Sequence, residues 1–156
     1  MHSTIPSHEL VGPVELTPRR AYQYTIDFRL QGVPGLVTDA TPPLGEGQGP
    51  DSERLLMAAV GNCLAASLTF SLRKFKNDLV CVKASVSASL GRNEHGRLRV
   101  QAMAVDLTLS AAAAELRLLD RALAQYEDFC VVTQSVRAAI PITVRVFDPA
   151  GALLTP

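Results

Sequence analysis

Hydrophobic and polar residues alternate with different periods along the chain, and each period predicts a different element. Residues 21–30 have the composition of a strand, residues 31–35 (QGVPG) that of a turn, and residues 36–38 that of a short return strand. Residues 79–91 alternate strictly, which places Cys81 on the face that points away from the core. The pattern thus predicts a tail over residues 1–20, a hairpin over 21–41 and a second, longer hairpin that begins at residue 79.

A long uncharged stretch follows the first hairpin. Over residues 55–72 no side chain is charged, and apolar side chains cover almost every side of a helical wheel. Acidic and hydroxyl side chains at 51–53 favour a helix start. We expect a loop over residues 42–50 and a buried helix over 51–76. About 18 uncharged residues also reach the lower limit for a membrane span. The stretch is only mildly apolar, however, so a buried helix is the better interpretation.

The rest of the chain, residues 79–148, predicts a hairpin, two helices and a last strand. The second strand of the hairpin changes its alternation, which a β-bulge near residues 102–105 would explain. Ser110 is a suitable cap for an amphipathic helix. The apolar stripe of that helix consists of Leu116, Leu119, Leu123 and Tyr126. A short helix after Cys130 and a strand over residues 142–146 complete the order.

This order of elements predicts an α+β fold in which antiparallel sheets wrap around a long central helix. The chain is short enough to be one domain, residues 1–156. A helix that is apolar on every side is more than one sheet of so small a chain can cover. A second subunit is the natural cover, so we expect a homodimer.

Charge and composition exclude several classes of partner and site. Lysine plus arginine equal 15, as do aspartate plus glutamate, so no field would hold nucleic acid or an anionic membrane. Residues 1–14 have neither the basic nor the apolar region of a signal peptide, which favours a cytoplasmic protein. The histidines and cysteines lack the spacing of metal ligands. The glycines at 45, 47 and 49 lack the rest of a nucleotide-binding fingerprint, which favours a flexible connector.

Cys63 and Cys130 are the candidates for chemistry. Three cysteines are too few, and odd in number, for the disulfide scaffold of a secreted domain. Free cysteine is often only a small buried hydrophobe, and that interpretation suits Cys63 in its apolar helix. For Cys130, at the end of an amphipathic helix, the structural and chemical interpretations are about equally supported. The residues alone therefore leave the role of both open.

Two motifs resemble one known family. The run GPDSERLLMAAVGNC at residues 49–63 is similar to a signature of the OsmC/Ohr proteins (osmotically inducible and organic hydroperoxide resistance proteins). In that signature a glutamate begins a Leu/Ala-rich helix, and the reactive cysteine follows ten residues later. The run FCVVTQSV at residues 129–136 is similar to a second signature. Val131 and Ser52 stand where the family usually has proline, and the loop over 33–50 is shorter than in the organic-hydroperoxide branch. The branch and its substrate therefore stay open.

The resemblance extends from about residue 22 to residue 147 and implies an OsmC-like intertwined homodimer. It also implies a cysteine-based peroxidase that reduces organic hydroperoxides in the oxidative stress response. Cys63 matches the peroxidatic cysteine and Cys130 the resolving cysteine, and the two would form a disulfide in each cycle. An external dithiol, such as a lipoyl-type thiol, would then reduce that disulfide. No bound cofactor is expected.

The family's catalytic arginine and glutamate match Arg29 and Glu53, with Arg19 and Arg20 as alternatives for the arginine. Burial raises the pKa of a cysteine unless a cation lies nearby, and Arg29 would supply that cation. Ten helical residues rise by about 15 Å, so Glu53 and Cys63 of one straight helix cannot share a site. Either the helix begins after Glu53 and the chain folds back, or Glu53 acts in the partner's site.

Two other functions fit the same pattern. One is a non-catalytic dimer of this fold that binds a small hydrophobic ligand in an apolar interface groove. The other is a thioesterase, because a long helix wrapped by a sheet also suits acyl-thioester chemistry. Its expected acid or base is missing from the helix, since no carboxylate or histidine lies between Arg54 and Arg73.

Overall fold

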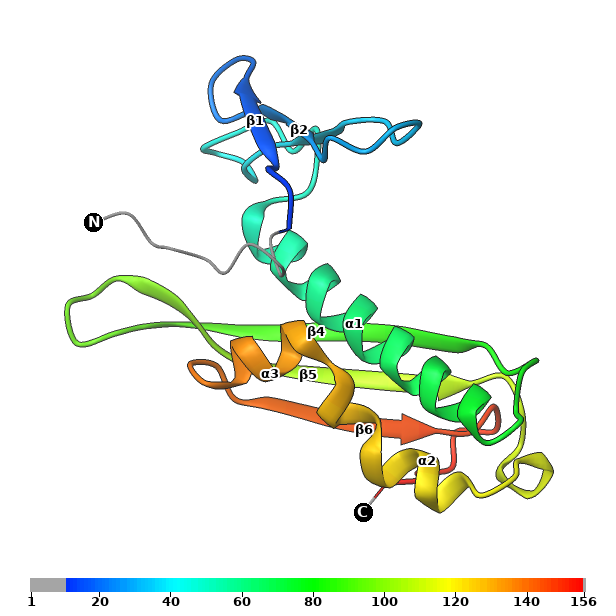
Figure 1. Ribbon diagram of the computed structural model, residues 1–156. Coiled ribbons are helices and arrows are strands. Elements are labelled where there is room, and N and C mark those ends of the chain that lie inside the picture. The colour runs from blue at the N-terminus through cyan, green and yellow to red at the C-terminus, as the bar shows by residue number, and fades with distance from the viewer. Residues whose placement is uncertain (1–10, 156) are drawn as a thin grey trace. The chain divides into compact units, whose positions relative to one another are not determined.

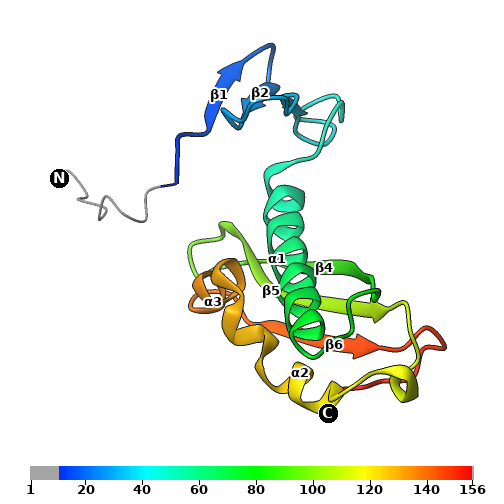
Figure 2. The same ribbon diagram turned by 45° about the vertical axis from the view of Figure 1, so that its right-hand side comes forward.

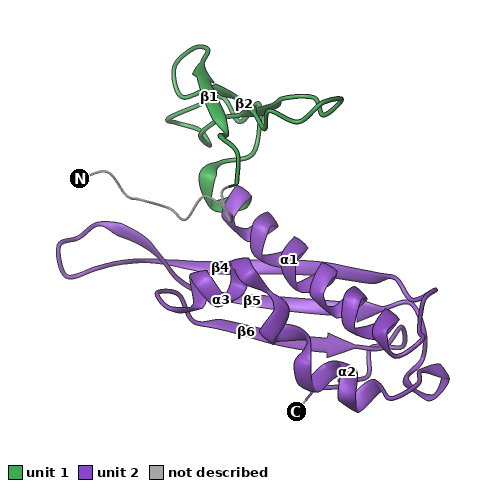
Figure 3. Cartoon of the chain, viewed as in Figure 1, with its two compact units in different colours: residues 1–54 green, residues 55–156 purple. Residues whose placement is uncertain are grey.

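The computed structural model describes residues 11–155, and its helices and strands are drawn in Figure 1. The chain groups into two compact units, residues 1–54 and residues 55–156, which are coloured green and purple in Figure 3. The expectation of one domain over residues 1–156 stays a prediction. His2 and His8 lie outside the described residues.

The first unit contains a small antiparallel sheet. Its strands are β1 (Glu15–Pro18), β2 (Tyr24–Asp27) and β3 (Leu36–Thr38), in the order β1-β2-β3. The expected hairpin is confirmed as β2 and β3, which pair from Tyr24↔Thr38 to Ile26↔Leu36. The expected tail over residues 1–20 is wrong for residues 15–18, which form β1. All four β1 residues are exposed, so this strand has no alternation of buried and exposed side chains that a sequence pattern could reveal.

The loop after β3 is held by one buried carboxylate. Asp39 is 3% exposed, and its Oδ2 accepts the backbone N–H groups of Glu46 at 3.0 Å and Gln48 at 3.1 Å. The Gln23 side-chain amide donates to the same oxygen at 3.2 Å. Burial raises the pKa of Asp39, but these donors outweigh it and keep the pKa below its ordinary value. The glycine-rich loop is therefore organised around Asp39, and is not the flexible connector that its composition suggests.

Helix α1 (Ser52–Lys74) confirms the expected central helix. Asp51 caps it, because its Oδ1 accepts the backbone N–H of Arg54 at 2.9 Å. The side chains that are buried form one stripe along the helix: Val60, Gly61, Leu64, Ser67, Leu68, Ser71 and Leu72. Among the described residues α1 has the length and composition to cross a membrane, but the core helix of a soluble protein meets the same test. Its buried stripe packs in the core of the second unit.

The second unit is built on a three-stranded sheet of order β4-β5-β6. Its strands are β4 (Val82–Arg92), β5 (Leu98–Leu109) and β6 (Ile142–Phe147). The β4–β5 hairpin is antiparallel as expected, whereas β6 runs parallel to β5 and so differs from the all-antiparallel sheets that the sequence suggested. In Figures 1 and 2, α1 lies across one face of this sheet. That face carries the alternate residues of β5, which are Met103, Val105, Leu107 and Leu109.

The expected bulge is present and lies slightly earlier than the sequence suggested. Ser89 pairs with Ala102 and Leu90 with Val100, so Gln101 is the extra residue of β5. It precedes the expected range of 102–105 by one residue. Cys81 is exposed, as the strict alternation of its strand predicted.

The segment between β5 and β6 forms short helices. These are the 3-10 helices η2 (Ala113–Glu115) and η3 (Tyr126–Phe129) and the α-helices α2 (Leu119–Gln125) and α3 (Val131–Arg137). Ser110 does not cap a helix as expected. Its Oγ accepts the backbone N–H of Cys81 at 2.9 Å instead, and Leu118 with a φ of 49° precedes α2. The stripe of this region is confirmed, with Tyr126 1% exposed and the three leucines partly buried against the core.

Gly61 sets how closely α1 approaches β4, because a Cβ there would lie 2.7 Å from Cγ2 of Val86. We expect Gly61→Val to lower the free energy of unfolding by about 1–3 kcal/mol, since extra methyl groups overpack the contact. Urea unfolding of the purified variant measures the change. Adding Val86→Ala should restore part of the loss. A double variant no more stable than Gly61→Val would contradict this explanation.

Candidate thiol site

Cys63 lies on α1 at the border between the buried stripe and the outward face of the helix. It is partly exposed, while Leu64 beside it is fully buried in the core. Ser67 follows one helical turn later, at the i+4 position that shares a face with Cys63. The helix thus presents a thiol that is held by the core and still reachable from outside it.

Cys130 lies between η3 and α3 and is fully buried. It occupies the position just before the first residue of α3, with extended backbone angles of φ −85° and ψ 92°. Its backbone N–H donates to the carbonyl of Glu127 at 3.0 Å, and its carbonyl accepts the N–H of Gln134 at 3.0 Å. Its Sγ is hydrogen-bonded to Oγ1 of Thr133 at 2.9 Å. The thiol is therefore fixed on the backbone turn that begins α3.

The two thiols interact with each other, and this interaction separates their acidities. Burial raises the pKa of Cys63, but hydrogen bonds from the Cys130 thiol, the backbone N–H groups of Val132 and Thr133 and the Ser67 hydroxyl outweigh it. The pKa of Cys63 lies below its ordinary value as a result. All of these donors stabilise a thiolate on Cys63, the ionised form that acts as a nucleophile.

The pKa of Cys130 moves in the opposite direction. Burial raises it, and the hydrogen bond with Cys63 raises it further, because a proton on Cys130 is held by the Cys63 sulfur. Thr133 opposes this shift without reversing it. At a pH between the two pKa values, Cys63 is ionised while Cys130 keeps its proton.

Sequence reasoning identified both cysteines and missed the groups that tune them. Ser67 and Thr133 could have been found from spacing, since they stand four residues after Cys63 and three after Cys130. The backbone donors of α3 carry no signal in the sequence. The causes that lower the pKa of Cys63 within the single chain include no cation, and the contribution expected of Arg29 stays a prediction.

Arg29, the arginine that the sequence put forward, lies in the first unit just after β2. Its guanidinium is half exposed and lies 3.6 Å from Glu15 and 3.5 Å from Asp27. Its backbone has a φ of 56°, and its N–H donates to Oδ1 of Asp27 at 2.7 Å. Since Cys63 belongs to the second unit, a role of Arg29 toward the thiol stays a prediction. Of the alternatives, Arg20 pairs with Glu46, and Arg19 is exposed.

Glu53 lies in the first turn of α1, because the helix begins at Ser52. The idea that the helix starts only after Glu53 is therefore wrong. Ten residues of continuous helix separate Glu53 from Cys63, which corresponds to about 15 Å of rise. Within one chain the two side chains do not share a site, and an action of Glu53 across a dimer stays a prediction.

Cys81 is exposed, and it is not among the groups that shift the pKa of Cys63 or Cys130. Over residues 11–155, no group of three or more histidine, cysteine, aspartate or glutamate side chains could hold a metal ion. The chemistry available within the described part of the second unit is therefore that of two adjacent thiols with unequal acidities.

The hydrogen bonds to Cys63 predict the pH at which it reacts. In a Cys81→Ser background, alkylation of Cys63 by iodoacetamide should have its midpoint below the free-thiol value of about 8.5. Cys130→Ala and Ser67→Ala should each raise this midpoint, because each removes a donor to the thiolate. Peptide mass spectrometry after alkylation across a pH series measures it.

Ser135→Ala is the matched control, since that hydroxyl donates to the carbonyl of Val131 at 2.8 Å and is not one of the donors that lower the pKa of Cys63. It should leave the midpoint in place. A midpoint at or above about 8.5 in the parent, or one that none of the variants moves, would contradict the hydrogen-bonded thiolate.

Comparison with known proteins agrees with this fold. The OsmC-like protein family matches residues 45–145. A solved structure of an organic hydroperoxide resistance protein from Legionella pneumophila aligns at 14% identity and a TM-score of 0.67, over 88% of this chain and 98% of that one. The organic hydroperoxide resistance protein OhrB of Bacillus subtilis aligns at 16% identity and a TM-score of 0.65, over 88% and 99%.

An OsmC-like protein of unknown function from Vibrio cholerae aligns at 17% identity and a TM-score of 0.68, over 86% of this chain and 97% of that chain. No curated protein matches the sequence. The family match spans well over half of the residues and includes Cys63 and Cys130. The chain therefore belongs to the OsmC-like protein family, which includes organic hydroperoxide resistance proteins.

Proposed function

We propose that this protein is a thiol-dependent peroxidase that reduces organic hydroperoxides. The observation that carries the proposal is the interacting pair of free thiols, in which the pKa of Cys63 is lowered and that of Cys130 is raised. A peroxidatic cysteine must be ionised and reachable, and a resolving cysteine must stand within reach of it. Membership of a family that includes organic hydroperoxide resistance proteins supports the same substrate class.

The first step oxidises Cys63. Its thiolate attacks the terminal oxygen of the hydroperoxide, the oxygen–oxygen bond breaks, and an S–O bond forms. The leaving alkoxide takes up a proton and departs as an alcohol. Cys63 gains the OH group as a sulfenic acid, and the peroxide receives the two electrons that the sulfur loses.

The second step joins the two sulfurs. Cys130 attacks the sulfenic sulfur, an S–S bond forms, and the OH group leaves as water with the proton of the Cys130 thiol. A small external dithiol, of which a lipoyl-type thiol is one example, then reduces the disulfide and is itself oxidised to a disulfide. Both cysteines return as thiols, so the cycle consumes one dithiol for each hydroperoxide.

We further propose that the protein works as a homodimer. The outward face of α1 carries no charge from Leu55 to Leu72, and Phe70 on it is 57% exposed in the single chain. The ring of Phe70 packs edge-on against that of Phe129 at 5.6 Å, and Phe129 is itself 47% exposed. An uncovered aromatic pair beside Cys130 favours a second subunit as cover. In such a dimer Glu53 and Arg29 would reach the thiols of the partner.

Substitution of the two cysteines separates their roles. Cys63→Ser should abolish reduction of cumene hydroperoxide by a dithiol, because the attacking thiolate is gone. Cys130→Ser should allow one turnover and then stall, with Cys63 trapped as a sulfenic or over-oxidised species. Peroxide consumption and the mass of the intact protein measure both. Equal multi-turnover rates for Cys63→Ser and the parent would contradict the proposal.

Thiol counting distinguishes the peroxidase from a non-catalytic ligand-binding dimer and from a thioesterase. One equivalent of alkyl hydroperoxide should remove two free thiols per chain in the parent and in Cys81→Ser, the matched control outside the pair. In Cys130→Ser it should remove only one. If no thiol is lost in the parent, one of the two other functions is favoured instead.

The dimer is tested by charging the outward face of α1. We expect the parent to sediment at twice the 16.7 kDa mass of the chain, and Phe70→Glu to shift it toward the monomer. His95→Glu, which adds the same carboxylate in the exposed turn between β4 and β5, should leave the mass unchanged. Circular dichroism checks that the variants are folded. A parent that sediments as a folded monomer would refute the dimer.

A further inference from the structure

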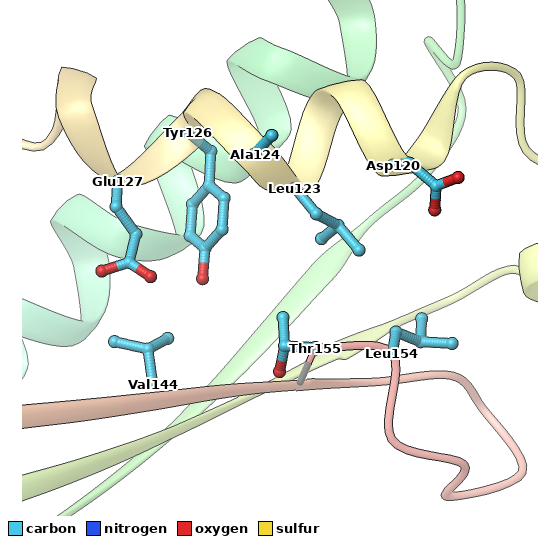
Figure 4. A pocket seen from close by; sticks show the side chains of 8 residues that line it. All are labelled: Asp120, Leu123, Ala124, Tyr126, Glu127, Val144, Leu154 and Thr155. Carbon is cyan, nitrogen blue, oxygen red and sulfur yellow. The ribbon is translucent and has the colours of Figure 1, made fainter.

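A groove of about 460 Å³ lies on the second unit between the α2–η3 segment, β6 and the segment that follows β6. Its volume is within the range of small-molecule sites. Figure 4 shows the side chains that line it, with the helical residues above and those of β6 and its following segment below. The lining residues are Asp120, Leu123, Ala124, Tyr126, Glu127, Val144, Leu154 and Thr155. The groove includes neither Cys63 nor Cys130.

One polar atom in this groove has no partner. Tyr126 is 1% exposed, and within the described residues its hydroxyl makes no hydrogen bond. Figure 4 shows the ring directed into the groove, with the hydroxyl toward Val144. The Glu127 carboxylate lies near enough to raise the pKa of the phenol further after burial, but it does not meet hydrogen-bond geometry with the hydroxyl. A buried O–H without an acceptor costs free energy, which an acceptor on a ligand would recover.

The charges at the groove are unequal. Glu127 pairs with the guanidinium of Arg137 at 2.5 Å, so its charge is already balanced. Asp120 is exposed at the other end of α2, and over residues 11–155 no salt bridge joins it to a cation. The groove therefore offers one unbalanced negative charge, about six residues or roughly 9 Å of helix rise from Tyr126.

The middle of the groove is apolar. Leu123 comes from α2 and Leu154 from the segment after β6, and both lie on the Asp120 side of Tyr126 in Figure 4, while Val144 of β6 lies below Glu127. Backbone pairing holds Leu154 in place, since its N–H donates to the carbonyl of Val146 at 2.7 Å. An apolar wall with a few polar groups at its ends is the usual form of a small-molecule site.

We propose that this groove binds a small amino alcohol or a similar organic cation with an apolar body. The ammonium group lies toward Asp120, the apolar body covers Leu123 and Leu154, and a neutral oxygen accepts the hydrogen bond of Tyr126. A carboxylate at the ammonium end is disfavoured, because it would face Asp120. This binding needs no peroxide chemistry, so it stands or falls independently of the thiol site.

The test uses the full chain and 6-amino-1-hexanol as the probe, followed by NMR chemical shifts or isothermal titration near pH 7, where the amine is charged. The probe should bind saturably at one site per chain. Hexylamine, which lacks the oxygen, and 1-hexanol, which lacks the cation, should each bind more weakly. Binding of 1-hexanol or 6-hydroxyhexanoate as tight as that of the probe would overturn the proposal, as would no saturable binding at millimolar concentration.

Substitutions locate the site. Tyr126→Phe should weaken binding of the probe by about three- to tenfold and leave hexylamine unchanged, because only the probe carries the acceptor. Asp120→Asn should weaken both amines by about two- to fivefold, as expected for an exposed ion pair. Asp128→Asn is the matched control, because Asp128 is an exposed carboxylate of η3 that does not line the groove. It should leave the binding of the probe and of hexylamine unchanged. Equal losses in Asp120→Asn and Asp128→Asn would overturn the site.

Discussion

The packing of one stripe of α1 against the β4–β6 sheet is the contact on which the rest of the second unit depends. Four large side chains of that stripe are fully buried: Val60, Leu64, Leu68 and Leu72. Burying each is worth roughly 1.5–3 kcal/mol, which is large against the net stability of a small domain. The same contact fixes the rotation of the helix, and that rotation puts Cys63 at the border of the core. Gly61 belongs to this contact as well, since a Cβ there would lie 2.7 Å from Cγ2 of Val86.

The thiol pair shows how a fold can give two identical groups different acidities. Cys63 gathers donors from its own helix and from the start of α3, while Cys130 is enclosed and hydrogen-bonded to a residue that prefers to be ionised. Burial and local hydrogen bonds together produce this difference in pKa between the two thiols.

Much of the fold could be predicted because each periodic pattern of apolar residues is contained within one segment of the chain. The alternation of β4, the uncharged run of α1 and the stripe that ends at Tyr126 are each complete within about 20 residues. Elements with no such pattern were missed. β1 is exposed along its whole length, and the direction of β6 is set by pairing with β5, which no local pattern encodes. Ser110 had the right residue type for a cap, but its hydroxyl serves the backbone of Cys81 instead.

Of the candidate site, only the two cysteines could be predicted from the sequence. Ser67 and Thr133 are ordinary residues until the fold brings them to the sulfurs, and the N–H groups of α3 exist as donors only once that helix forms. Sequence spacing can place groups on one helix face, but it cannot say which face of a second element will meet it. The same limit applies to Asp39, whose oxygen gathers backbone donors from a loop several residues away.

The parallel pairing of β6 with β5 has a consequence for when the thiols become reactive. A parallel strand needs a crossover connection, and Cys130 lies on that connection, while Cys63 lies on a helix formed earlier in the chain. The two sulfurs therefore meet only after the crossover has closed over the sheet. An emerging or partly unfolded chain carries cysteines of ordinary acidity, and the reactive pair appears with the last strand. The lowered pKa of Cys63 therefore depends on residues 132 and 133 of the crossover being in place.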